Sequence, residues 1–99
     1  MKKTLKETCG TSFYGSTIKA SLTQLKTICG EPPYHGDPED KVQWSWDMET
    51  ESGGVFTIYD WKEYRYFIDT EVIEWHIGGF NKFHTIEAQT ELQNALLKL

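Results

Sequence analysis

Cysteine is scarce in this chain, and its placement excludes the most common scaffolds of small proteins. The two cysteines, Cys9 and Cys29, lie twenty positions apart, and the sequence contains neither a CxxC nor an HxxxH pair. This spacing excludes a zinc finger and a disulfide-rich framework. The two residues would allow one bridge, but a pair of cysteines without a signal-peptide pattern favours reduced thiols, which are typical of the cytoplasm.

Long apolar runs and an excess of basic residues are also lacking. The chain begins Met-Lys-Lys, but no apolar segment follows that would act as a signal peptide or cross a membrane. Fifteen acidic residues outnumber ten basic ones, which gives a formal net charge of -5. Phosphate backbones and anionic lipids attract basic surfaces. We therefore expect a cytoplasmic protein that binds neither duplex nucleic acid nor membranes.

Motifs of catalysis and of phosphate-binding loops are missing as well. The sequence contains no GxSxG, GxxxxGK[ST] or GxGxxG. The three histidines, at positions 35, 76 and 84, have no spacing typical of a metal site. The sequence thus predicts a protein that is not an enzyme and has no catalytic residues, metal or cofactor.

Aromatic residues, by contrast, are abundant at 14%, and they mark the core. Residues 42–49 alternate, which is the period-2 pattern of a half-buried strand. One face carries Val42, Trp44, Trp46 and Met48, and the other carries Gln43, Ser45, Asp47 and Glu49. Residues 55–62 follow a glycine-containing turn and are rich in β-branched and aromatic residues on both faces, so a central strand is expected there.

The remaining patterns complete a prediction of the fold. Residues 3–8 suggest a short edge strand, residues 71–77 alternate, and a helix is expected from about residue 85 to the end. Ser21 and Gln24 fit a capping box for a short helix that ends before Gly30. We expect one α+β domain over residues 1–99, an antiparallel β-meander of about four strands with a short helix after strand one and a C-terminal amphipathic helix. An uncovered aromatic face would favour a homo-oligomer.

Two segments suggest a site for a small anion. Gly78 and Gly79 end a strand, Lys82 follows, and the coming helix would direct free amides outward. The stretch 10–17 combines two glycines with four hydroxyl side chains and Tyr14, which suits a binding loop, with Thr11 and Ser12 toward phosphate. We expect these segments to meet in one hollow. A tight turn and an irregular connection are the structural alternatives.

Two further positions bring aromatic and charged groups near such a site. Asp60, Trp61 and Lys62 place a carboxylate, an indole and an ammonium at one strand end, and an exposed indole or Tyr14 would stack on a base. Core packing is the alternative for Trp61. His76 lies on the face of its strand opposite Trp75. Its side chain would either contact a ligand or find its hydrogen-bond partners within the sheet.

Several of these segments together resemble a family of small, mostly uncharacterised bacteriophage proteins. The resemblance covers nearly the whole chain, and its most specific part is the pairing of TIYDWK at residues 57–62 with WHIGG at residues 75–79. The other segments are Gly10-Thr11-Ser12, the helix end from Leu25 through Gly30 to Pro32, and Lys41-Val42.

What the resemblance implies is a counter-defence role in the host cytoplasm. Some phage proteins of this kind are sponges that sequester nucleotide-derived immune messengers in oligomeric shells. The expected function is therefore non-enzymatic capture of a small anionic, nucleotide-like ligand. The alternative is an inhibitor that blocks a host defence enzyme through an exposed aromatic face. A third hypothesis is a structural component of a phage.

Overall fold

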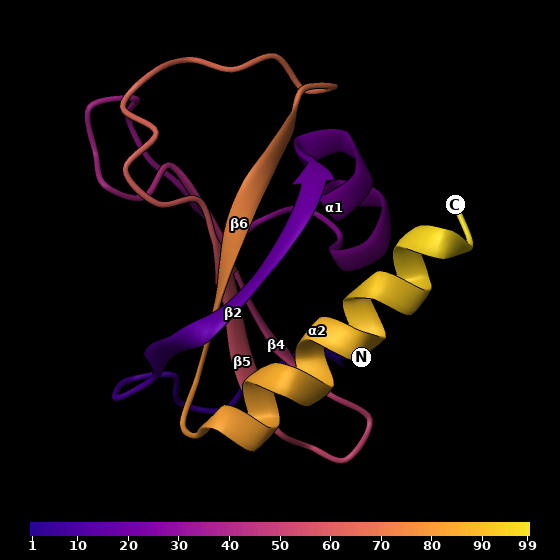
Figure 1. The fold of residues 1–99 in the computed structure, drawn as a ribbon. Coiled ribbons are helices and arrows are strands. Elements are labelled where there is room, and N and C mark those ends of the chain that lie inside the picture. The colour runs from indigo at the N-terminus through magenta and orange to yellow at the C-terminus, as the bar shows by residue number, and fades with distance from the viewer.

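The protein is an antiparallel sheet with two helices on one face. The computed structural model describes the backbone of residues 1–99 and every side chain except that of Tyr34. The elements are β1 (Lys2–Lys3), β2 (Ser12–Ser21), α1 (Leu22–Cys29), β3 (Tyr34–His35), β4 (Trp44–Glu49), β5 (Val55–Tyr59), β6 (Val72–Gly79) and α2 (Lys82–Leu97). The sheet order is β1-β4-β5-β6-β2, and β3 pairs with β4 beside this path. Both helices lie on the same side of the sheet (Figure 1).

The predicted α+β class, hairpin, short helix and C-terminal helix are confirmed. In the β4–β5 hairpin, Trp46 pairs with Ile58, as the alternating pattern requires. The capping box of α1 forms in both directions: Ser21 Oγ accepts from the Gln24 amide at 3.1 Å, and Gln24 Oε1 accepts from the Ser21 amide at 2.9 Å. Gly30 ends the helix with a φ of +82°, where glycine has no Cβ penalty.

Strand number and helix placement differ from the prediction. The sheet is not a four-stranded meander, because the long strand β2 joins its far edge by pairing with β6, and α1 follows this second strand rather than the first. The hydroxyl-rich stretch 10–17 that was expected to be a loop provides the beginning of β2. An irregularity between Phe13 and Thr17, with Gly15 at φ +94°, absorbs two extra residues of β2.

The core lies between the sheet and the helices, and two tryptophans dominate it. Trp46 and Trp75 are fully buried and meet edge to face at 5.6 Å. Each indole N–H has a carbonyl acceptor: Gly30 at 2.8 Å for Trp46 and Ala20 at 2.9 Å for Trp75. Helix α2 begins at Lys82, earlier than expected, because Asn81 caps the amide of His84. Its buried residues are Thr85, Ala88 and Leu92.

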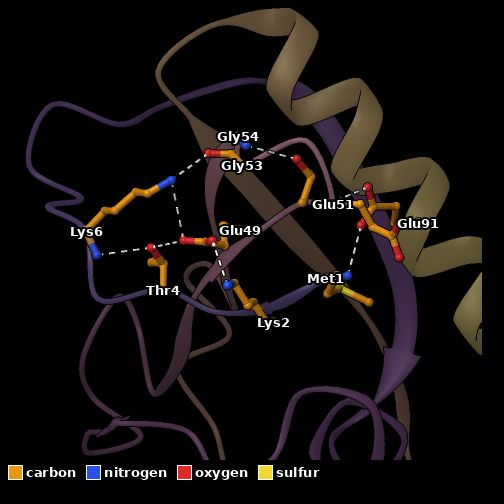
Figure 2. A network of polar contacts seen from close by, with 10 residues as sticks. Met1, Lys2, Thr4, Lys6, Glu49, Glu51, Gly53, Gly54 and Glu91 are labelled. Atoms are coloured by element: carbon orange, nitrogen blue, oxygen red, sulfur yellow. Dashed lines mark hydrogen bonds and ion pairs between the residues drawn. The ribbon is translucent and has the colours of Figure 1, made fainter.

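Polar contacts attach the N-terminal segment to the rest of the fold (Figure 2). Glu49 of β4 accepts a hydrogen bond from Thr4 Oγ1 at 2.7 Å and forms ion pairs with Lys2 at 3.5 Å and Lys6 at 3.7 Å. Lys6 also donates to the Gly53 carbonyl in the β4–β5 turn. The segment therefore covers the outer edge of β4, the strand that also carries Asp47 of the candidate site.

Candidate functional site

The sheet face that carries no helix presents two rows of side chains across its strands. In one row, Asp47 of β4 pairs with Thr57 of β5, which pairs with Gly78 of β6, and Gly78 pairs with Phe13 of β2. In the second row the cross-strand pairs are Ser45 with Tyr59, Tyr59 with His76, and His76 with Thr17. Residues directly opposite one another in an antiparallel sheet share a face. This face is therefore mixed polar and aromatic, unlike the apolar core face.

A hollow of about 290 Å³ opens on this face. Its lining comes mainly from β2, β4, β5 and β6, and its volume is close to the lower limit of about 300 Å³ for small-molecule sites. The lining residues are Thr11, Ser12, Val42, Ser45, Asp47, Thr57, Tyr59, Trp61 and Gly78. Five of these nine carry a hydroxyl group, so the wall offers many hydrogen-bond donors and acceptors to a ligand.

Four aromatic rings cluster beside the hollow. The rings of Phe13 and His76 stack at 4.0 Å with an interplanar angle of 15°, and Trp61 lies nearly parallel to His76 at 6.1 Å. Tyr59 meets both Trp61 and His76 edge to face. Trp61 remains 40% exposed, so part of this aromatic platform is free to stack on a planar ligand.

The charge of the hollow is acidic rather than basic. Burial raises the pKa of the Asp47 carboxyl, and the nearby Glu7 raises it further. Among the described side chains that line the hollow there is no lysine or arginine. Burial lowers the pKa of His76, which favours its neutral imidazole, and burial raises the pKa of the Tyr59 hydroxyl. Lys62 places a cation beside the platform, with its Nζ 5.3 Å from the centre of the Trp61 ring.

Three of the six predicted site residues from the two expected segments come together. Thr11, Ser12 and Gly78 all line the hollow, because Ser12 pairs with Gly79 and Phe13 with Gly78 across β2 and β6. Trp61 lines the same hollow and is exposed, rather than packed in the core. His76 belongs to the aromatic platform next to it.

Four of the predicted residues lie elsewhere. Gly79 faces the helices, since a Cβ built on it would lie 2.8 Å from Thr85 Cγ2. Asp60 is fully buried and accepts hydrogen bonds from the amides of Gln43 and Trp44. The remaining two are Tyr14, whose hydroxyl donates to the Phe80 carbonyl, and Lys82, which begins α2 outside the hollow.

The glycine pair also lacks the exposed amides expected for an anion site. Gly78 and Gly79 lie inside β6, paired with β2 on one side and with β5 on the other. The start of α2 is separately capped by Asn81. The pair instead gives room for two threonine side chains: a Cβ on Gly78 would lie 2.6 Å from Thr57 Oγ1, just as one on Gly79 would meet Thr85.

Sequence reasoning missed Phe13, Asp47 and Tyr59 as functional candidates. The sequence pattern did point to Asp47 and Tyr59. The alternation in residues 42–49 places Asp47 on the polar face of its strand, and Tyr59 lies on the neighbouring strand of the same hairpin. It did not point to Phe13, because the position of Phe13 depends on the pairing of β2 with β6, which the sequence pattern did not predict.

Comparisons with known proteins identify no relative of this chain. The chain matches no family model, and comparisons with curated proteins and with solved structures find no significant match. In the part of the chain that the structure describes, no helix is both long and apolar enough to span a bilayer. The described side chains also form no group of three or more metal-ligating residues.

Proposed function

We propose that the protein is a non-enzymatic binding protein that captures a small, nucleotide-like ligand on the uncovered sheet face. The observation that carries this proposal is the aromatic platform of Phe13, His76, Trp61 and Tyr59 beside a hydroxyl-lined hollow. A planar base stacks on aromatic rings with about 1–3 kcal/mol per base. The platform therefore supports binding of the base, and the hollow supports binding of the polar part.

The acidic wall of the hollow determines the orientation in which such a ligand binds. A phosphate group deep in the hollow would face the carboxylate of Asp47, and like charges at short distance repel. A sugar fits better there, because carboxylates accept hydrogen bonds from ribose hydroxyls in nucleotide sites. The phosphate then lies at the rim, where Lys62 provides a positive charge next to the Trp61 ring.

The biological context of the proposal comes from the resemblance to small bacteriophage proteins. Capture of a nucleotide-derived signal in the host cytoplasm would sequester it from a defence pathway. Self-association into a homo-oligomer stays a prediction, and it would bury the exposed Phe13 and Val72 of the open face.

A thermal-shift panel tests the capture. Adenosine, guanosine, their monophosphates and cyclic mono- and dinucleotides are compared with inorganic phosphate and ribose 5-phosphate. A ligand that binds only the folded state stabilises it by RT ln(1 + [L]/Kd), so the unfolding temperature should rise with the concentration of a base-containing compound. Trp61→Ala and Asp47→Asn should abolish this rise, and Phe83→Ala, which removes an exposed aromatic ring from α2, should preserve it.

Two outcomes would overturn the proposal. One is a panel in which no base-containing compound shifts the transition of the wild-type protein. The other is a shift that Trp61→Ala retains in full, because the ligand would then bind outside the hollow.

The second candidate function is inhibition of a host defence enzyme through an exposed aromatic surface. The observation that favours it is the segment after β5, in which Tyr64, Tyr66 and Ile68 are 51%, 85% and 70% exposed. Exposed aromatic side chains grouped on one surface are typical of protein-protein contacts.

A further inference from the structure

Two loops that are distant in sequence form one surface beside the sheet. Residues 36–41 lie between β3 and β4, and residues 61–71 lie between β5 and β6. Figure 1 shows them side by side, away from α2. The Lys62 amide donates to the Lys41 carbonyl at 2.7 Å, and a hollow of about 350 Å³ is lined by Asp37, Pro38, Glu39 and Tyr66. We call these two segments the loop pair.

The longer loop is anchored at several points. Phe67 packs edge to face on the buried Trp75 at 6.2 Å, and Gln43 Nε2 donates to the Arg65 carbonyl at 3.0 Å. The guanidinium of Arg65 forms a two-point ion pair with Glu71 at the other end of the loop. An anchored loop loses little conformational freedom when a partner binds.

The same loop holds several other large side chains away from the core. Lys62 and Tyr64 have φ values of +54° and +53°, a conformation that non-glycine residues adopt rarely and that costs free energy. Tyr66 is 85% exposed although its neighbour Phe67 packs inward. Strained backbone that displays aromatic side chains to solvent is a feature that stability alone does not explain.

The loop pair also concentrates the negative charge of the molecule. Its seventeen residues contain six carboxylates and three basic side chains, which is a net charge of -3 out of the total of -5. Of the three basic groups, Arg65 is already paired with Glu71 and Glu63. The hollow next to Tyr66 therefore presents the carboxylates of Asp37 and Glu39 without a basic residue in its lining.

We propose that the loop pair binds an arginine-rich segment of a partner protein. A guanidinium is planar and weakly hydrated, so it stacks on a tyrosine ring while its N–H groups pair with carboxylates. Tyr66 with Asp37 and Glu39 offers both interactions within one hollow. Lysine pairs with carboxylates but stacks less well, so arginine is the preferred side chain. The hollow beside Tyr66 shares no lining residue with the ligand hollow on the sheet.

Fluorescence anisotropy with a labelled hexa-arginine peptide tests this surface, with hexa-lysine and hexa-glutamate peptides for comparison. The wild-type protein should bind hexa-arginine most tightly, and more weakly as salt increases. Tyr66→Ser and the double variant Asp37→Asn/Glu39→Gln should each weaken binding by about fivefold or more, from lost stacking or lost charge. The altered side chains are exposed, and circular dichroism checks that both variants fold.

Matched controls separate this surface from attraction to net charge. Phe83→Ser removes an equally exposed aromatic residue, and Glu51→Gln/Glu74→Gln removes two exposed carboxylates outside the loop pair. Both controls should stay within about twofold of the wild-type affinity, as expected for distant surface charges. The proposal is overturned if the controls weaken binding as much as the loop variants do, or if hexa-lysine binds as tightly as hexa-arginine.

Discussion

At the scale of single residues, Asp60 shows how a buried carboxylate can be structural rather than functional. Its Oδ1 accepts hydrogen bonds from the amides of Gln43 at 2.8 Å and Trp44 at 2.7 Å, which join the end of β5 to the start of β4. Its Oδ2 is buried and has no partner among the described groups. Burial raises the pKa of Asp60, and the two amides lower it by a smaller amount. The joined segments place Val42 and Trp61 on the wall of the ligand hollow.

Substitutions at Asp60 separate its charge from its hydrogen bonds. Asp60→Asn keeps an accepting oxygen and should be at least as stable as the wild type at pH 7. Asp60→Ala leaves two amides unpaired and should cost about 2–6 kcal/mol, because each buried unpaired group costs about 1–3 kcal/mol. The folded-state pKa is raised, so the contribution of Asp60 to stability is present below its unfolded pKa and is lost as pH rises through the folded value.

Urea unfolding of both variants between pH 3 and neutrality measures these effects, since that range spans the ordinary pKa of an aspartate, about 3.9. The stability of Asp60→Asn relative to the wild type should increase as pH rises. An Asn variant as unstable as the Ala variant, or a difference that does not change with pH, would contradict this account.

At the scale of secondary-structure elements, β6 separates the ligand hollow from α2, and its glycine pair serves both faces. Gly78→Ala would place a Cβ against the half-buried Thr57 at the hollow, and Gly79→Ala would place one against the fully buried Thr85 under α2. We expect Gly79→Ala to cost about 1–3 kcal/mol, typical of overpacking in a core, and Gly78→Ala to cost less, because Thr57 is freer to turn. Only Gly78→Ala should weaken the nucleotide-induced thermal shift.

Denaturant unfolding and the nucleotide panel, applied to both variants, distinguish this packing role from anion binding through the glycine amides. The packing role is contradicted if the two variants are equally stable and lose the ligand-induced thermal shift equally. That result would show that both glycines act on the ligand, and not that each glycine makes room for its own threonine.

The elements also show which parts of the fold the sequence pattern predicts and why it did not predict the others. The β4–β5 hairpin and β6 were predictable because large apolar residues alternate, and α1 because Ser21 and Gln24 form a local cap. Strand β2 was not, since two of its inward residues, Ser16 and Ala20, are small or polar, and the strand is buried by its packing against β6, α2 and α1. The meeting of Ser12 with the glycine pair was anticipated from composition, but its basis is strand pairing rather than a binding loop.

At the scale of the whole molecule, Glu49 connects segments that are far apart in the chain. It accepts from Thr4 and pairs with Lys2 and Lys6, and Lys6 extends the network to the β4–β5 turn (Figure 2). The hydrogen bond from Thr4, followed by the two lysines, lowers the pKa of the Glu49 carboxyl. A lowered folded-state pKa stabilises the protein above the unfolded value, and this contribution is lost as pH falls through the folded value.

Acid should therefore loosen the N-terminal segment before it unfolds the core. In the wild type, the Thr4 amide, which donates to the Asp47 carbonyl at 3.1 Å, should become less protected from hydrogen exchange as pH falls below the ordinary glutamate value of about 4.3, beyond the intrinsic pH dependence of exchange. In Glu49→Gln the same amide should be less protected at neutral pH and should show no such transition. Glu31→Gln, which changes an exposed ion pair with Lys26, is the matched control and should behave as the wild type. The opposite result would be a Thr4 amide that stays protected in Glu49→Gln at neutral pH. The backbone pairing of β1 with β4 would then hold the segment without this carboxylate, and the network in Figure 2 would be a consequence of the strand pairing rather than its cause.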